Sequence, residues 1–100
     1  MAVYRVERTR DYTVMANYHL RDTALSLKAK GLLSLMLSLP DSWDYTTRGL
    51  AAICRDGVDA IRATVRELER NGYVIRRRIR NAQGQLTVTE YTILERPQPK

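Results

Sequence analysis

The stretch from Asp56 to Arg80, DGVDAIRATVRELERNGYVIRRRIR, constrains the fold of this chain more than any other stretch does. Its first part repeats apolar residues at the spacing of one helix face: Val58, Ile61, Val65 and Leu68. Asn71-Gly72 ends this pattern, because glycine readily adopts the left-handed conformation that closes a helix. The chain then alternates like a strand and carries four arginines: Arg76, Arg77, Arg78 and Arg80. The pattern predicts a helix over 58–70 that leads directly into an arginine-rich strand.

This strand has a partner further along the chain. Two β-rich runs, 73–80 and 87–94, flank a polar segment that contains a glycine, Asn81 to Gln85, which is typical of a β-hairpin. Strict alternation predicts that Tyr73, Ile75 and Ile79 point inward, while Arg76, Arg78 and Arg80 share the opposite face. In the second strand, Tyr91 and Ile93 are expected to point inward.

Two more helices are expected before residue 56. Ser26 is a good cap for a helix that ends before Pro40, with a wide apolar face made of Leu25, Ala29, Leu32, Leu33, Met36 and Leu37. Gly31 inside this helix suggests that another element packs close to its backbone. A shorter helix, capped by Thr46 or Thr47, should turn Leu50, Ala51 and Ile53 inward. Asp56 and Asp59 resemble a capping pair for the helix that follows.

The N-terminal region reads as strand. Residues 4–8 and 12–15 alternate apolar and polar side chains and predict two strands, either separate or paired as a hairpin, with one shared face made of Tyr4, Val6, Tyr12 and Val14. The expected order is therefore β, (β), α, α, α, β, β. We predict an α+β fold in which a three-helix core carries a C-terminal two-stranded wing and an N-terminal strand or hairpin. The domain should span 1–95, with 96–100 as a tail or the start of a linker.

Charge and cysteine content narrow the function. The chain of 100 residues has a net charge of +6 and a pI near 9.9, and residues 73–86 hold four arginines and no acid, which favours a polyanionic partner. A lone Cys54 allows no intrachain disulfide and no cysteine zinc site. His19, the sole histidine, is expected to be structural. We expect no cofactor, metal, small-molecule ligand or membrane partner, and a cytoplasmic location because no apolar signal segment is present.

These features together predict a helix–turn–helix with a wing that binds double-stranded DNA. A recognition helix over 58–70 would turn Arg62 and Arg66, one helical turn apart, towards the same groove. Small Ala63 would allow close approach, and Asp59 either caps the helix or accepts from cytosine, with the cap favoured. The candidate DNA-binding residues are Thr46, Thr47, Arg48, Val58, Asp59, Arg62, Ala63, Arg66, Arg76, Arg78, Arg80 and Gln83. Four to six phosphate contacts would make binding steeply dependent on salt.

Several runs also carry a family resemblance: Leu27 to Leu32 (LKAKGL), Ser38 to Asp41 with Trp43, and Glu67-Leu68-Glu69 leading to Asn71-Gly72-Tyr73. They resemble the helix-turn-helix domains at the N-terminus of replication-initiator and DnaD-like proteins, mainly from prophages, plasmids and conjugative elements of Gram-positive bacteria. The resemblance covers about residues 4 to 95. It implies a winged-helix DNA-binding domain, usually joined through a flexible linker to a further domain.

Other functions stay open at this stage. A broader similarity to GntR-type and MarR-type regulators around Ile61-Arg62 and Glu67-Leu68-Glu69 leaves a transcriptional regulator as an alternative. Gly57-Val58 and Ala60 depart from the Ser, Arg and Thr that are common there. A winged helix can also serve protein assembly, as a homodimer or with a replication-protein partner. An enzyme is the weakest option, because the sequence offers no catalytic carboxylate pair, Cys/His pair or Gly-rich phosphate loop. The arginines could also be an ordinary solvated face.

Overall fold

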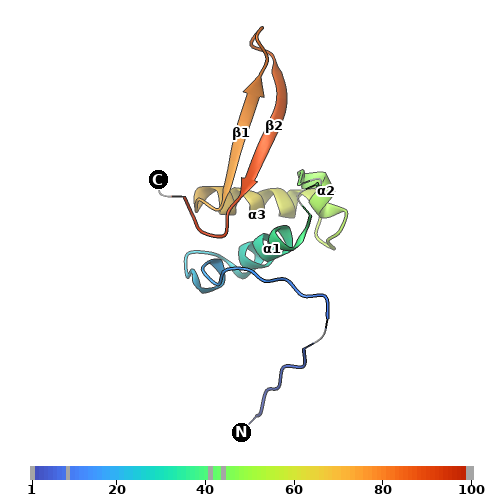
Figure 1. The fold of residues 1–100 in the computed structure, drawn as a ribbon, viewed down its shortest axis with the longest axis vertical. Coiled ribbons are helices and arrows are strands. Elements are labelled where there is room, and N and C mark those ends of the chain that lie inside the picture. The colour runs from blue at the N-terminus through green and yellow to red at the C-terminus, as the bar shows by residue number, and fades with distance from the viewer. Residues whose placement is uncertain (1, 9, 41, 44, 99–100) are drawn as a thin grey trace.

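A computed structural model describes residues 2–8, 10–40, 42–43 and 45–98. Its elements, in chain order, are a short 3-10 helix η1 (His19–Arg21), helices α1 (Leu27–Ser38), α2 (Thr47–Ala51) and α3 (Val58–Arg70), and strands β1 (Val74–Arg80) and β2 (Leu86–Ile93). The two strands form an antiparallel hairpin that projects from the helices, while the N-terminal segment leaves on the other side (Figure 1). The predicted α+β class, with three α-helices before a C-terminal hairpin, is confirmed.

Helix α1 begins at its predicted cap. The Ser26 hydroxyl oxygen accepts from the Ala29 amide at 3.1 Å, and the helix ends at Ser38, two residues before Pro40. The same cap is tied to α3, because the Glu67 carboxylate accepts from both the Ser26 amide and the Ser26 hydroxyl, each at 2.7 Å. These two bonds fix the start of α1 against the third turn of α3.

The start of α3 corrects one prediction. Gly57 is the N-cap residue and no side chain caps this helix, so the expected pairing of Asp56 with Asp59 does not form. The Asp59 carboxylate instead accepts from Arg62 within the helix. At the preceding α2, Thr46 is the cap, because its hydroxyl oxygen accepts from the Gly49 amide at 3.1 Å. Ile53 is 42% exposed, contrary to prediction, because α2 ends at Ala51 and Ile53 lies in the turn.

Helix α3 ends at Asn71-Gly72, as predicted. Gly72 has a φ of +85°, the Tyr73 amide donates to the Leu68 carbonyl, and the Gly72 amide donates to the Glu69 carbonyl, which together form a Schellman motif. Tyr73 is fully buried, and its hydroxyl donates to Asp22 at 2.7 Å. Gly72 also lies against the C-terminal tail, because the Gln98 amide donates to its carbonyl.

Tyr73 belongs to this cap and not to β1. The residues on each face of the hairpin therefore differ from those predicted. Strand β1 begins at Val74, which is 2% exposed and pairs with Ile93. Arg76 is opposite Tyr91, and Arg78 is opposite Thr89. Tyr73 is buried as predicted, but the predicted inward orientation of Ile75 and Ile79 is wrong, because both are only half-buried on the face away from Val74. The arginine face is the face that enters the core at the base of the hairpin, because side chains two residues apart in a strand share a face.

Near its tip the hairpin is irregular. The pairing of β1 with β2 shifts between Ile79 and Arg80, which leaves an extra residue in β2 and makes a β-bulge. The turn is closed by the Asn81 amide, which donates to the Gln85 carbonyl, and Gly84 has a φ of +79°. The Asn81 side-chain oxygen accepts from the amides of Gln83 and Gln85, each at 3.0 Å.

The core lies where α1, α3 and the base of the hairpin meet. Its buried apolar residues are Leu25, Ala29, Leu32, Leu33, Met36, Leu50, Ile61, Leu68, Tyr73 and Val74. A side chain added at Gly31 would meet no atom within 4 Å. The expected close approach at Gly31 is therefore wrong, because this position of α1 faces solvent.

The N-terminal strands are also absent from the described residues: 2–8 and 10–16 have no regular structure. Their apolar side chains are exposed, with Tyr4 at 91%, Val6 at 76%, Tyr12 at 79% and Val14 at 87%. Asp11 has a φ of +61° and marks the bend between the two runs. The alternation was correct as a pattern, but a two-stranded hairpin that buries no face is at best marginally stable. The predicted N-terminal strand or hairpin is therefore not formed.

Candidate nucleic-acid interface

One exposed face of α3 carries three arginines. Five exposed residues follow the helical repeat along this face: Asp59, Arg62, Ala63, Arg66 and Arg70. The opposite face is fixed in the core by Ile61 and Leu68. Arg62, Ala63 and Arg66 are thus placed on the exposed face as expected, whereas Val58 is half-buried at the first turn.

Arg70 extends this row by one turn and was missed by the sequence reasoning. Its spacing of four residues from Arg66 contained the signal, but nearby glutamates suggested an ordinary surface pair. In the structure Arg70 is exposed. Its charge helps to lower the pKa of Glu67, although the hydrogen bonds from Ser26 are the larger cause.

The arginines of the hairpin divide between its two faces. Arg76, Arg78 and Arg80 are exposed on the face that continues from Val74, and Arg77 lies on the other face, opposite Glu90. The described residues provide no ion-pair partner for Arg78. Arg80 donates to the Gly84 carbonyl at 3.0 Å, which holds its guanidinium near the turn.

The two arginine rows meet at Glu69. An Arg76 nitrogen lies 3.7 Å from a Glu69 carboxylate oxygen, so the arginine face of β1 turns towards α3. Glu69 follows Arg66 by three residues and Arg62 by seven, which places all three on one side of the helix. The hairpin rises from the C-terminal half of α3 (Figure 1). Helix and hairpin therefore form one angled surface that holds six arginines: Arg62, Arg66, Arg70, Arg76, Arg78 and Arg80.

We call this set of six the arginine surface. Among the described residues, Asp59 and Glu69 are the acids paired with it, at 3.0 Å to Arg62 and at 3.7 Å to Arg76. The pair of Asp59 and Arg62 is exposed, at 98% and 49%, and such pairs stabilise proteins by no more than about 1 kcal/mol. The surface thus keeps a strongly positive character.

The start of α2 lies beside the hairpin. Trp43, Tyr45 and Thr46 line a small hollow together with Thr89 and Tyr91 of β2. Because Thr89 is opposite Arg78, this brings the first turn of α2 near the arginine face of the hairpin. Of the three candidates there, Arg48 is exposed and Thr47 is half-buried, while the Thr46 hydroxyl is engaged in the cap. Gln83 is exposed at the hairpin turn.

His19 is buried, away from the arginine surface. One ring nitrogen, Nε2, lies 2.8 Å from the Ser34 hydroxyl, which itself donates to the Lys30 carbonyl. The Ser34 oxygen therefore accepts from Nε2–H, and Nδ1 has no partner among the described residues. Burial lowers the pKa of the ring, against a smaller opposing effect of Glu95. The neutral ring acts as a packing group between η1 and α1.

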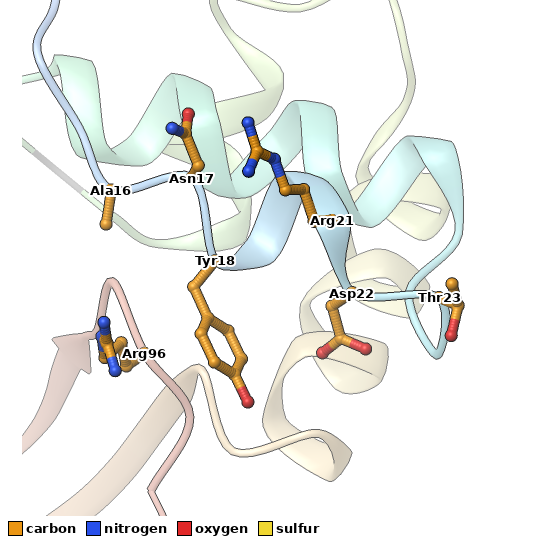
Figure 2. A pocket seen from close by; sticks show the side chains of 7 residues that line it. All are labelled: Ala16, Asn17, Tyr18, Arg21, Asp22, Thr23 and Arg96. Carbon is orange, nitrogen blue, oxygen red and sulfur yellow. The ribbon is translucent and has the colours of Figure 1, made fainter.

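A separate open hollow of about 520 Å³ lies around Tyr18 and is lined by residues 16–18, residues 21–23 and Arg96 of the tail. Figure 2 shows the side chains that line it. The Arg96 guanidinium carbon lies 5.4 Å from the Tyr18 ring centre, a cation–π distance. The Asp22 carboxylate is already bonded to Tyr73 and to the Ala24 amide, and these bonds lower its pKa. The groups in this hollow thus hold the tail against η1.

Comparison of the chain with models of known protein families, with curated proteins and with solved structures gives no match in any of the three. The resemblance to replication-initiator domains stays a prediction. Within the described part of the chain, no helix has the length and apolar content needed to cross a membrane.

Proposed function

We propose that this chain is a winged helix-turn-helix domain that binds double-stranded DNA, as the N-terminal module of a mobile-element replication initiation protein. Helices α2 and α3 are the helix-turn-helix, α3 is the recognition helix, and the hairpin is the wing. The observation that supports this best is the arginine surface, on which α3 and β1 present six arginines against two acids. Arginine suits such a surface, because its planar fork matches phosphate oxygens and guanine edges.

The order of the elements supports the same proposal. A recognition helix needs one face fixed in the core and one face free for the major groove, and α3 has both. The hairpin then meets the neighbouring backbone or minor groove. A transcriptional regulator would use the same surface, so the proposal of replication initiation depends on the family resemblance alone.

A second candidate function, protein assembly, is favoured by a different observation. The N-terminal segment exposes large apolar side chains, among them Tyr4, Val6, Tyr12 and Val14, and exposed apolar patches often mark interfaces. This function does not compete for the arginine surface, and both can operate in one molecule.

The test is fluorescence anisotropy with labelled duplex DNA at two salt concentrations. With about five phosphate contacts, the logarithm of the association constant should fall with the logarithm of salt concentration with a slope of about −4.5. Absence of binding at low salt, or an association constant that does not change with salt concentration, would exclude the proposal.

Replacing Arg76, Arg78 and Arg80 together with Ala tests the role of the wing. If all three contact phosphates, the slope should become less steep by about 2.7. The matched control replaces Arg8, Arg21 and Lys28 with Ala; these exposed residues lie outside the arginine surface, and the variant removes the same total charge. An equal loss in both triple variants would mean that only net charge matters.

A further inference from the structure

The N-terminal arm, which we define as residues 2–8, has the sequence of a strand but pairs with no strand in the described part of the chain. Val3, Tyr4 and Val6 are exposed by 76% or more. Tyr4 and Val6 would share one face of an extended chain, and Val3, Arg5 and Glu7 the other. Such exposed alternating apolar side chains are costly in water, which suggests that a partner covers them.

The hairpin offers an edge for such a strand. Among the described residues its sheet has only two strands, so β2 has an unpaired edge. Beside the base of β2 lies a groove of about 400 Å³, formed mainly by Leu37, Leu39, Tyr45, Tyr91 and Ile93. These five side chains are half-buried and keep part of their apolar surface open to solvent.

The arm and the groove match in spacing and in charge. Tyr4 and Val6 are two residues apart, about 6.7 Å along a strand, as are Tyr91 and Ile93 on β2. A strand added with Tyr4 and Val6 over the groove would place Arg5 on the other face, next to Glu90. A basic residue would thus meet the acid of this edge, and cross-strand pairs of opposite charge are favourable.

We infer that the arm of one copy adds as a third strand to the edge of β2 in a second copy, and that the exchange is reciprocal. The occupant is a second copy because the arm leads away from its own hairpin, on the other side of the helices (Figure 1). Two arms and two grooves then satisfy each other around a two-fold axis, the commonest symmetry of protein dimers. The inference does not depend on DNA binding.

Crosslinking identifies the surface that the arm contacts. A chain with Val6→p-benzoylphenylalanine is prepared with and without heavy nitrogen, and the two forms are mixed, illuminated and digested. Crosslinks should join the arm to residues 36–39 or 90–93, and should include pairs that combine one labelled and one unlabelled peptide. Crosslinks confined to unmixed pairs, or to other segments, overturn the inference.

Sedimentation equilibrium tests the dimer and the face of the arm. The unmodified chain should dimerise with rising concentration, and Val6→Lys should raise the dimer dissociation constant by about tenfold or more. The matched control is Val3→Lys, on the other face of the same arm, which should change the dissociation constant by less than about twofold. A chain that is monomeric at all concentrations, or an equal effect of both variants, contradicts the inference. Helix content from circular dichroism should stay unchanged in both, because the arm is exposed.

Discussion

Asp59 is almost fully exposed in the first turn of α3, and its carboxylate holds Arg62 at 3.0 Å. It does not cap the helix, so its charge has two remaining effects. It positions the Arg62 guanidinium, and it repels phosphates that approach the arginine surface. In the proposed complex with DNA, this residue would therefore weaken binding to the backbone and favour contacts made by a fixed arginine.

We accordingly expect Asp59→Asn to bind random-sequence duplex DNA more tightly than the unmodified chain, by about threefold to tenfold at low salt. The free energy of unfolding should change by no more than about 1 kcal/mol, since exposed pairs and first-turn acids contribute little. Anisotropy and urea unfolding measure the two effects. Glu7→Gln removes an acid from the arm and is the matched control. Equal gains in both would leave Asp59 with no local role.

Two separate constraints require glycine at position 72. Its φ of +85° disfavours any side chain, and an added Cβ would approach the Gln98 carbonyl oxygen to 2.8 Å. Gly72→Ala should lower the free energy of unfolding by about 2 to 4 kcal/mol, part for the left-handed backbone and part for the displaced tail. Gly84→Ala is the control, because Gly84 has a similar φ of +79° but open space around it. Urea unfolding should show a clearly smaller loss there, and equal losses would mean that the tail contact contributes nothing.

At the scale of elements, two carboxylates link segments that are far apart in sequence. Asp22, after η1, accepts from the hydroxyl of Tyr73, and Glu67 of α3 accepts from the cap of α1. These bonds lower the pKa of both carboxyls below their ordinary range. The unfolded chain therefore binds protons more readily than the folded chain when these groups titrate.

This sign predicts that stability is fully present above about pH 4.5 and is lost as the pH falls through the lowered pKa values. Urea unfolding between pH 3 and 6 should show the decline, and Tyr73→Phe should make it shallower by removing the bond to Asp22. Tyr18→Phe is the control, because its exposed ring makes no such bond. The lowered pKa of His19 has the same sign but acts from about pH 6.5 downward, so its effect should appear in a separate range. A decline of equal slope in Tyr73→Phe would contradict the assignment.

The elements also show which features a sequence can predict. The bounds of α3 were predicted because local residues determine both of its ends: Gly57 before it and Asn71-Gly72 after it. The faces of the hairpin were not, since Tyr73 completes the cap of α3 and alternation starts one residue later. Glu69 was missed as the residue that joins the two arginine rows, because its link to Arg76 depends on how the hairpin folds back on the helix.

The prediction of strands in the N-terminal region was wrong for a different physical reason. Alternation describes how a segment would behave in a sheet, but a strand exists only when another strand supplies its hydrogen bonds. The sequence of residues 4–15 does not indicate whether such a partner strand is present within the chain. Alternation therefore predicts a tendency to form a strand, and the tertiary structure determines whether the strand forms.

For the molecule as a whole, the arm should be dispensable for folding. Residues 2–8 and 10–14 are exposed, so deleting residues 2–14 should leave the urea midpoint of a dilute sample unchanged, within the change of about 0.5 kcal/mol that surface substitutions give. The bond from the Ala16 amide to Glu95, at 2.7 Å, lies beyond the deletion and should remain. A large loss of stability would show that the arm packs on its own domain in solution.

The bulge near the hairpin tip has a geometric consequence for the arginine surface. A regular strand would set Arg76, Arg78 and Arg80 in a straight line, but a bulge bends the ladder and increases its twist. We therefore expect the last arginine to be rotated away from the direction of the other two, so that the row forms an arc. A straight row would touch a double helix along a tangent. In the proposed complex, a curved row would follow the winding of a single backbone strand, so the extra residue in β2 would set how far around the duplex the protein reaches.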